Sequence, residues 1–175
     1  MDPYTNIAII TSLQPRKGLK QFVEILKNSK LKKIQYYLIS QDDIQLDYLN
    51  VTHIKPKNDN DYVSALKRCH FILSTSTFEG FGLPLIEAMS YGTPVLTANN
   101  SSMPEVCGDA GLLVDAFDVN SIAEGLRSMI LNKKLLKNLS NKARLNASRY
   151  SWDESSKKLL KVFEQAVMLR KSKYK

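Results

Sequence analysis

The stretch STSTFEGFGLPLIEAMSYG, residues 74–92, decides the fold of this chain. It follows a short apolar run at residues 70–73 that predicts a buried strand. The stretch then opens into a loop with two glycines, and it places Pro84 where a helix would begin and Gly92 where that helix would stop. The N-terminus of such a helix presents unpaired N–H groups and the positive end of the helix dipole. Strand, glycine loop and helix therefore predict an anion-binding loop.

Two carboxylates bracket this loop, Glu79 before the glycines and Glu87 inside the expected helix. Gly80 and Gly82 would let the backbone approach a ligand closely. A carboxylate offers two acceptor oxygens, which suits a ligand rich in hydroxyl groups. The alternative is a structural turn with two solvated glutamates, and the spacing alone leaves both interpretations open.

The segment EGFGLPLIEAM, residues 79–89, resembles the signature of the family 4 retaining glycosyltransferases, which have the two-domain B-type fold. That signature is a pair of glutamates separated by seven residues, as Glu79 and Glu87 are here. The following segment TPVLTANNSSMPEVCGDAGLLVDAFD resembles the next part of the family, and Tyr150-Ser151-Trp152 resembles the start of its closing helix. The resemblance is densest over residues 74–118 and extends from residue 7 to about residue 167.

Length and composition allow one sizeable domain, because the chain has 175 residues and an ordinary apolar content. Its net charge is +8, and seven basic residues fall in the last nineteen positions. Such a bias suits an anionic partner, such as a phosphate-bearing ligand or a membrane surface, or a solvated helix face. The two cysteines, Cys69 and Cys107, form no CxxC motif, so we expect reduced, structural thiols in a cytoplasmic chain. No apolar run is long enough to span a membrane, and no signal peptide is evident.

The order of elements predicts an α/β fold, a Rossmann-like doubly wound parallel sheet of about six strands. Apolar runs alternate with segments of helical periodicity, and the loops after the strands should converge on one edge of the sheet. A short helix is expected to start at Asp42 or Asp43. A helix cap is expected at Asn58 or Asp59, and the Ser-x-x-Glu pattern predicts further caps at Ser102 and Ser121. The expected strands are residues 6–11, 36–40, 51–54, 70–74, 94–97 and 111–114.

The resemblance implies that this is the C-terminal half of a B-type glycosyltransferase fold. Residues 1–170 would form a nucleotide-sugar donor-binding domain that ends in a closing helix at about 152–170, with a basic, frayed tail at 171–175. The N-terminal acceptor domain would be absent from this chain, either because it is an excised piece or because a separate subunit supplies it. In the resembled fold the closing helix crosses to the other domain, so Leu159, Leu160 and Phe163 are expected to be partly exposed.

In the resembled family the donor is a sugar linked to a nucleoside diphosphate, and the second glutamate accepts hydrogen bonds from the ribose. This assigns Glu87 to the ribose and places Glu79 near the donor sugar as a catalytic residue. The loop residues Gly80, Phe81, Gly82 and Leu83 would contact the sugar or the diphosphate through their backbone.

The loop after the first strand departs from the family pattern Gly-Arg-Leu-x-x-x-Lys-Gly. Lys17 is in place and would neutralise the diphosphate as the second catalytic residue. Thr11 occupies the glycine position and Ser12 the arginine position, so Arg16 is the candidate to supply the missing charge. Residues near Lys57 would contact the nucleobase.

Two other patterns point elsewhere. Asp59-Asn60-Asp61 is an Asp-x-Asp, the metal motif of the other major glycosyltransferase fold, but Asp is also common at helix starts. No His, Cys or carboxylate cluster has ligand spacing, so we expect no metal and no cofactor beyond the nucleotide sugar as co-substrate. The basic C-terminal helix is a candidate for peripheral contact with a membrane surface, whereas the chain lacks a basic–aromatic pattern typical of nucleic-acid binding.

The function implied by the resemblance is transfer of a sugar from a nucleoside-diphosphate sugar to an acceptor, with retention. The biosynthesis of a polysaccharide, glycolipid or glycoconjugate would be its setting. Two alternatives remain open: a non-catalytic nucleotide-sugar binding module, which the departure at Ser12 favours, and a nucleotide-sugar epimerase, which shares the architecture.

Overall fold

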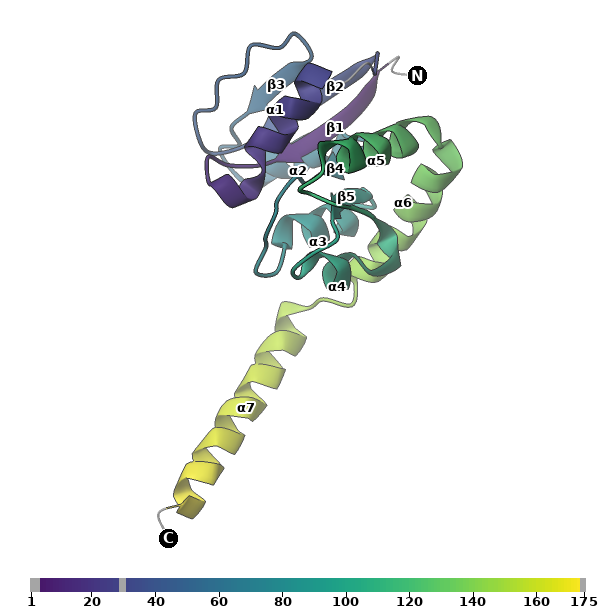
Figure 1. Cartoon of the computed structure of the whole chain (residues 1–175). Helices are drawn as coiled ribbons and strands as arrows, with labels where there is room; N and C mark the ends of the chain where they lie inside the picture. The colour runs from purple at the N-terminus through teal and green to yellow at the C-terminus, as the bar shows by residue number, and fades with distance from the viewer. Residues whose placement is uncertain (1–3, 29–30, 174–175) are drawn as a thin grey trace.

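The fold is a six-stranded parallel sheet covered by helices on both faces (Figure 1). The computed structural model describes residues 4–28 and 31–173. The strand order is β3-β2-β1-β4-β5-β6, so the direction of winding reverses between β1 and β4. This is the predicted doubly wound, Rossmann-like arrangement. The strands are β1 (Thr5–Ile10), β2 (Ile34–Ile39), β3 (Val51–Ile54), β4 (Phe71–Leu73), β5 (Val95–Ala98) and β6 (Gly111–Val114).

The central strands are buried on both faces, which explains why their sequences are continuous apolar runs. In β1, Ile7 and Ile9 face one core and Ala8 faces the other, and none of the three is exposed. Ile7 pairs with Phe71 and Ile9 pairs with Leu73 across the junction of β1 and β4. The two strands whose carboxyl ends define the reversal point are therefore held in a fixed register.

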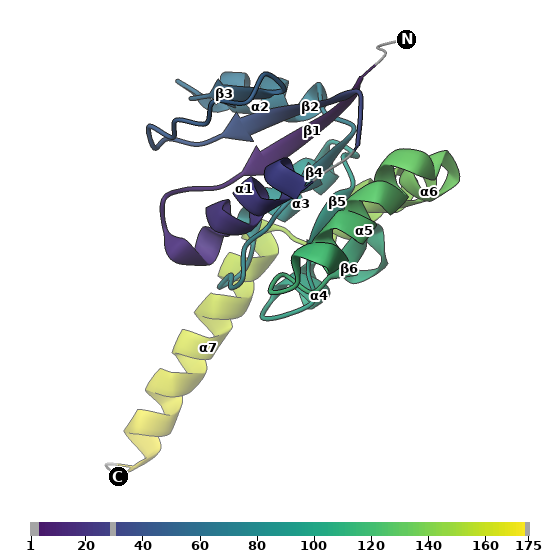
Figure 2. The ribbon, with the colours of Figure 1, turned by 45° about the horizontal axis from the view of Figure 1, so that its top comes forward.

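Helices α1 and α5 pack on one face of the sheet, and α2, α3 and α4 pack on the other, while α6 contributes to both cores (Figures 1 and 2). Short 3-10 turns precede α1 and follow α4. The helices are α1 (Leu19–Asn28), α2 (Asp59–Lys67), α3 (Leu83–Ser90), α4 (Met103–Cys107), α5 (Val119–Leu131), α6 (Lys133–Ala147) and α7 (Trp152–Lys173). Cys69 and Cys107 are free and buried, as expected.

Two local predictions were wrong and a third was correct only in part, because polar side chains form hydrogen bonds elsewhere. No helix starts at Asp42, whose carboxylate accepts a hydrogen bond from the Leu13 N–H at 2.6 Å and so holds two loops together. A short helix, α4, does begin directly after Ser102 as predicted, but the Ser102 side chain makes no capping hydrogen bond to it. Helix α5 begins at Val119 with Asp118 as its cap, and Ser121 instead accepts a hydrogen bond from the Asp115 N–H. The predicted cap at Asn58 is confirmed by its hydrogen bond from the Asp61 N–H.

Helix α7 projects away from the body of the domain (Figures 1 and 2). Every residue from 152 to 170 is exposed. Leu159, Leu160 and Phe163 are 53%, 58% and 57% exposed, which confirms the prediction that these apolar residues do not pack on their own domain. The helix continues to Lys173, beyond the expected start of the tail, and residues 174–175 lie outside the described part. No helix in the described ranges has the length and hydropathy needed to cross a bilayer.

Candidate functional site

The loops after β1 and β4 meet at the point where the strand order reverses, and they bring three charged side chains together. Lys17 Nζ lies 2.7 Å from Glu79 Oε1, and Arg16 Nη1 lies 3.2 Å from Glu79 Oε2. Arg16 also donates to the Phe78 carbonyl at 3.2 Å. One carboxylate thus bridges two cations, and this cluster of Arg16, Lys17 and Glu79 carries a net positive charge.

The Glu79 carboxylate is held in its ionised form by this cluster. Partial burial by itself would raise the pKa of Glu79, since burial disfavours the charged form. Hydrogen bonds from Lys17 and Ser76 and the charges of Lys17 and Arg16 outweigh that effect, so the pKa of Glu79 lies below its ordinary value. Its side chain is only 12% exposed, which limits screening by solvent.

The loop that carries Lys17 is fixed to the strand-β4 loop by close backbone approach. Gly18 has a φ of +70°, and a Cβ there would lie 1.8 Å from the Thr75 carbonyl oxygen, so only glycine fits. The Thr77 N–H donates to the Arg16 carbonyl at 2.8 Å. Thr11, at the family's glycine position, donates through its hydroxyl to the Lys17 carbonyl at 3.0 Å. Thr11, which replaces the family's glycine, therefore stabilises the loop after β1 through a hydrogen bond within that loop.

A third loop, after β5, supports the loop between β4 and α3 (residues 74–82, the signature loop), a role that sequence reasoning missed. Ser101 Oγ accepts a hydrogen bond from the Glu79 N–H at 3.1 Å. Ser102 Oγ contacts the Glu79 and Phe81 carbonyls at 2.9 and 3.0 Å. Asn100 Nδ2 donates to the Thr77 carbonyl at 2.8 Å. The Ser-x-x-Glu pattern predicted a helix cap at Ser102, so it did not point to these hydrogen bonds.

The signature glycines and their neighbours form the N-terminus of α3. Gly82 is the N-cap with a φ of +95°, and Pro84 follows in the first turn. Phe81 packs edge-on against Tyr150, with ring centroids 5.6 Å apart. Gly80, Phe81 and Leu83 are exposed at this edge. A narrow recess lies beneath the helix start, lined by Ile10, Lys17, Ile72, Ser74, Glu79, Gly82, Pro84 and Leu85.

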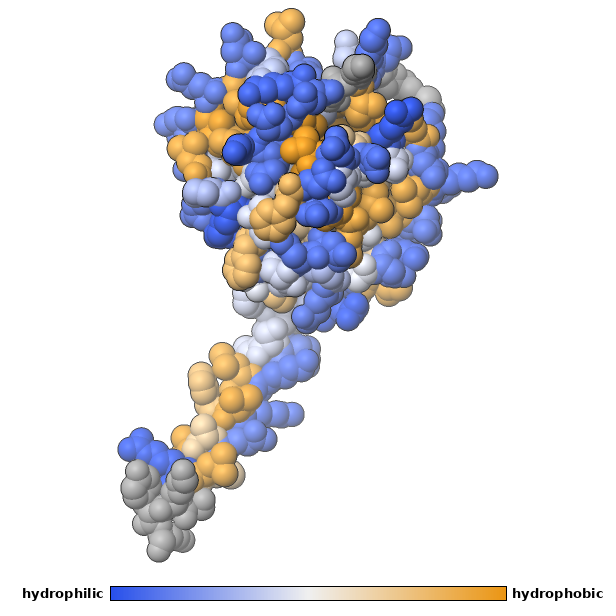
Figure 3. Space-filling view, in the orientation of Figure 1, coloured by the Kyte–Doolittle hydropathy of each residue, from blue (hydrophilic) through white to orange (hydrophobic). Residues whose placement is uncertain are grey.

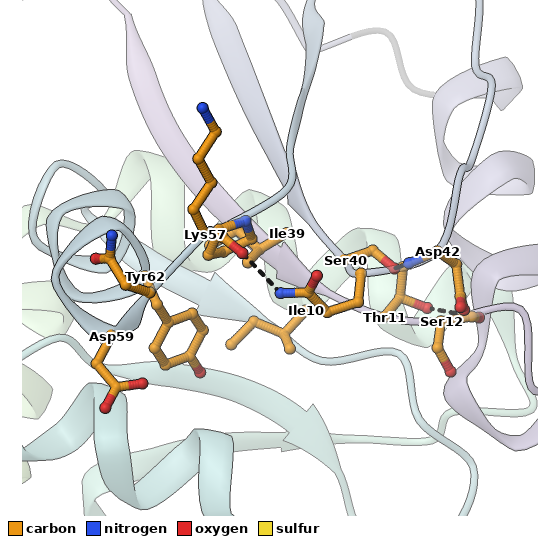
Figure 4. Close-up of a pocket in the computed structure, with 12 residues that line it drawn as sticks. Ile10, Thr11, Ser12, Ile39, Ser40, Asp42, Lys57, Asp59 and Tyr62 are labelled. Carbon is orange, nitrogen blue, oxygen red and sulfur yellow. Dashed lines mark hydrogen bonds between the residues drawn. The ribbon is translucent and has the colours of Figure 1, made fainter.

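A larger cavity of about 500 Å³ adjoins this recess and shares Ile10 with it. Ser12 and Lys57, both predicted site residues, line this cavity and not the charged cluster (Figure 4). The Lys57 ammonium group points away from the other labelled side chains (Figure 4). Its lining combines hydroxyl and amide side chains with apolar ones. The cavity is lined by Ile10, Thr11, Ser12, Ile39, Ser40, Gln41, Asp42, Pro56, Lys57, Asn58, Asp59 and Tyr62.

Glu87 lies in α3 and is not among the residues that line the cavity. It is connected to the cavity by Tyr62 of α2, whose hydroxyl donates to Glu87 Oε2 at 2.9 Å. Tyr62 was not among the site residues that the sequence predicted. Nothing in the spacing of Tyr62 and Glu87 indicated the contact, because they are on different helices.

The Asp-x-Asp pattern has a structural explanation. Asp61 Oδ2 accepts a hydrogen bond from the Lys57 N–H at 3.1 Å, and the Asp61 N–H donates to Asn58 at the start of α2. Within residues 4–28 and 31–173, no group of three or more His, Cys, Asp or Glu side chains is arranged to hold a metal ion. Arg16, Lys17 and the N-terminus of α3 place positive charge at this edge of the sheet.

Fold and site define an α/β protein of Rossmann type with a cationic cluster and a cavity at the reversal point of its sheet. A family model described as "Glycosyl transferases group 1" matches residues 3–146. The chain therefore belongs to the group 1 glycosyltransferases, as the resemblance implied.

Similar proteins agree with this assignment. Over 171 residues the chain is 28% identical to O-antigen chain mannosyltransferase B of Escherichia coli, covering 89% of this chain and 44% of that protein. Its fold matches the sucrose-phosphate synthase of Thermosynechococcus elongatus with a TM-score of 0.78 at 19% identity, covering 94% of this chain and 46% of the other. It also matches Anabaena Alr3699/HepE, solved in complex with UDP and glucose, with a TM-score of 0.77 at 18% identity, covering 93% and 48%. The chain spans less than half the length of each, as expected for one half of a B-type fold.

Proposed function

We propose that this chain is the donor-binding half of a retaining glycosyltransferase that transfers a sugar from a nucleoside-diphosphate sugar to an acceptor. The observation that carries the proposal is the cluster of Arg16, Lys17 and Glu79, placed beside a cavity of about 500 Å³ at the start of α3. In this proposal the nucleoside occupies the cavity and the diphosphate lies over the cationic cluster. Its setting would be the synthesis of a polysaccharide, glycolipid or glycoconjugate in the cytoplasm, with α7 as a candidate contact to a membrane surface.

The proposed chemistry is departure of the nucleoside diphosphate while positive charge develops at the anomeric carbon. Lys17, Arg16 and the N-terminus of α3 would stabilise the negative charge that develops on the leaving diphosphate. Glu79 would lie near the developing positive charge, and its lowered pKa keeps it anionic. The acceptor would attack from the face that the leaving group vacates. We propose that no metal takes part and that Arg16 and Lys17 would neutralise the diphosphate in its place.

Arg16 is the proposed substitute for the arginine that the family carries at the position of Ser12. Its guanidinium already reaches the same carboxylate as Lys17, from the same loop. Ser12 lies in the cavity and its Oγ accepts a hydrogen bond from the Gln14 N–H at 3.3 Å. The charge would therefore be supplied four residues later along the chain, on the side of Glu79.

The experiment is a calorimetric titration of this chain with UDP, GDP, ADP and the corresponding nucleotide sugars. We expect one base to bind, and we expect Lys17→Ala to weaken that binding about 10- to 100-fold, since a charge-assisted hydrogen bond contributes about 1.5–3 kcal/mol. Glu87→Ala and Arg16→Ala should also weaken it. Lys20→Ala is the matched control, because Lys20 is an exposed lysine on the adjacent helix α1. Absence of binding by the folded chain, or equal loss in Lys17→Ala and Lys20→Ala, would contradict the proposal.

The second candidate is a nucleotide-sugar binding module without catalysis, and Ser12 at the arginine position is the observation that favours it. The two candidates predict the same binding and differ in turnover. Transfer of sugar to an acceptor by the chain together with its acceptor-binding half would support the transferase. Binding with no transfer under those conditions would support the module. EDTA added to the transfer reaction should leave the rate unchanged if no metal takes part.

A further inference from the structure

We infer that Tyr62 is a positioning residue that orients Glu87 toward the ribose of the donor, and thereby sets the preference of the site for a ribonucleotide over a deoxyribonucleotide. This inference rests on the proposed function, in which Glu87 accepts hydrogen bonds from the ribose. Tyr62 lies on a different helix from Glu87, α2, and its ring forms part of the cavity wall.

The first argument is the reach of Tyr62. Its ring lines the cavity on the side of Ile10 and Asp59 (Figure 4), and it packs against the core beneath α2 and α3. Its hydroxyl donates to Glu87 Oε2 at 2.9 Å. Glu87 does not line the cavity, so Tyr62 is the physical connection between this carboxylate and the space in which a nucleoside would lie.

The second argument is that Tyr62 is a permanent donor. Burial, reinforced by the negative charge of Glu87 and by the hydrogen bond to it, raises the pKa of the Tyr62 hydroxyl far above its ordinary value. The hydroxyl therefore keeps its proton at any working pH and donates it to the carboxylate. A tyrosine that is anchored by its ring and cannot ionise holds its acceptor in one place.

The third argument is the hydrogen-bonding capacity that the Glu87 carboxylate has left. Its side chain is exposed and has no other hydrogen bond or ion pair among the described residues than the one to Tyr62. An exposed glutamate on a helix loses rotamer freedom when it binds a ligand, and that loss lowers affinity. Tyr62 removes part of this freedom in advance by holding Oε2, which leaves Oε1 and the second lone pair of Oε2 for a vicinal diol.

The test is a cycle that combines the variant Tyr62→Phe with the removal of a hydroxyl from the ligand. Phenylalanine keeps the ring that walls the cavity and removes only the hydroxyl. Binding of UDP and of 2′-deoxy-UDP, or of the corresponding pair for whichever base the chain binds, is measured by calorimetry for the wild type and the variant. Tyr91→Phe is the matched control: it removes a hydroxyl at the end of α3, from a ring that lies under the Lys67 ammonium group, whereas the hydrogen bond to the Glu87 carboxylate comes from Tyr62.

We expect the wild type and Tyr91→Phe to prefer the ribonucleotide by about tenfold, the size of one hydrogen bond to a charged group. Tyr62→Phe should reduce this preference to about two- to threefold, because it weakens binding of the ribonucleotide and leaves binding of the deoxyribonucleotide unchanged. If Tyr62→Phe weakens both ligands equally and keeps the wild-type preference, Tyr62 is only a wall of the cavity and the inference is overturned. If the wild type binds no nucleotide, the proposed function fails as well. Binding without a ribose preference overturns the roles of both Glu87 and Tyr62 and leaves the diphosphate site standing.

Discussion

At the residue scale, the site depends on one carboxylate that is shared between two cations. Glu79 contacts Lys17 and Arg16 from a loop whose backbone is held by Ser101 and Ser102. The Arg16 and Lys17 side chains remain 43% and 21% exposed beside Glu79, so a diphosphate could reach them without displacing the carboxylate. Glu79 keeps both cations oriented before a ligand arrives, and such preorganisation lowers the cost of binding.

The lowered pKa of Glu79 makes a prediction about stability and pH. Because the folded-state pKa lies below the unfolded value of about 4.5, Glu79 stabilises the fold above that pH, and this stabilisation is lost as the pH falls through the folded-state pKa. We expect Glu79→Gln to lower the free energy of unfolding at pH 7 by roughly 1.5–3 kcal/mol, the usual range for a hydrogen bond to a charged group. Below pH 4.5 the difference from the wild type should shrink. Urea denaturation at pH 7, 4.5 and 3.5 measures it.

The matched control for that prediction is Glu24→Gln. Glu24 pairs with Lys27 at 3.2 Å on the exposed surface of α1, in an i,i+3 arrangement. Such pairs contribute about 0.2–0.5 kcal/mol, so this variant should follow the wild type at every pH. A Glu79→Gln variant with the same pH dependence as the wild type would show that the cluster does not stabilise the fold.

At the element scale, α7 is the helix that does not pack on its own domain. Apolar side chains form a stripe along it, and basic side chains occupy the other side (Figure 3). The positions of Trp152, Leu159, Phe163 and Val167 fall on one face at 100° per residue. A stripe of this size in water favours association. In the resembled fold the other domain covers this helix.

We therefore expect the isolated chain to self-associate through α7. The double variant Leu159→Glu with Phe163→Glu should remove this association and leave the thermal stability of the domain unchanged, because neither side chain is buried. Gln165→Glu with Met168→Glu adds the same two charges to the opposite face and should keep the association. Sedimentation velocity across a range of protein concentrations measures it. A wild-type chain that stays monomeric throughout that range would contradict the prediction.

At the scale of the whole molecule, the chain contains one six-stranded parallel sheet with the candidate site at its edge, and it spans less than half of the E. coli relative. In the proposal the acceptor binds to the half that this chain does not contain. The exposed residues Phe78, Phe81, Leu83 and Phe117 lie at or near the site edge of the sheet, where that other half would pack.

We expect the chain alone to bind a nucleotide sugar weakly and to transfer little sugar. The measurement is release of nucleoside diphosphate from the nucleotide sugar identified by titration, with and without simple sugar acceptors. Glu79→Gln supplies the background rate. Sustained turnover by the isolated chain, well above that of Glu79→Gln, would show that the donor half is sufficient and would contradict the division of labour proposed here.

The sequence by itself determined the class of fold and most of the candidate site. Apolar runs alternating with helical periodicity specify a parallel sheet because both patterns are local, and the signature around Glu79 and Glu87 is contiguous in the chain. Its glycines and proline also determine the loop and the start of α3, since their backbone preferences are intrinsic. The family assignment rests on the same contiguous segments.

Only the tertiary structure decided which side chains meet across loops and helices. It placed Ser12 in the wall of the cavity, and it paired Arg16 and Lys17 with Glu79. It assigned Ser102 to the signature loop instead of a helix cap and joined Tyr62 to Glu87. These contacts link residues more than twenty positions apart. The identity of a serine or a tyrosine does not specify its partner, because each can donate to any acceptor that the packing of the sheet brings within reach.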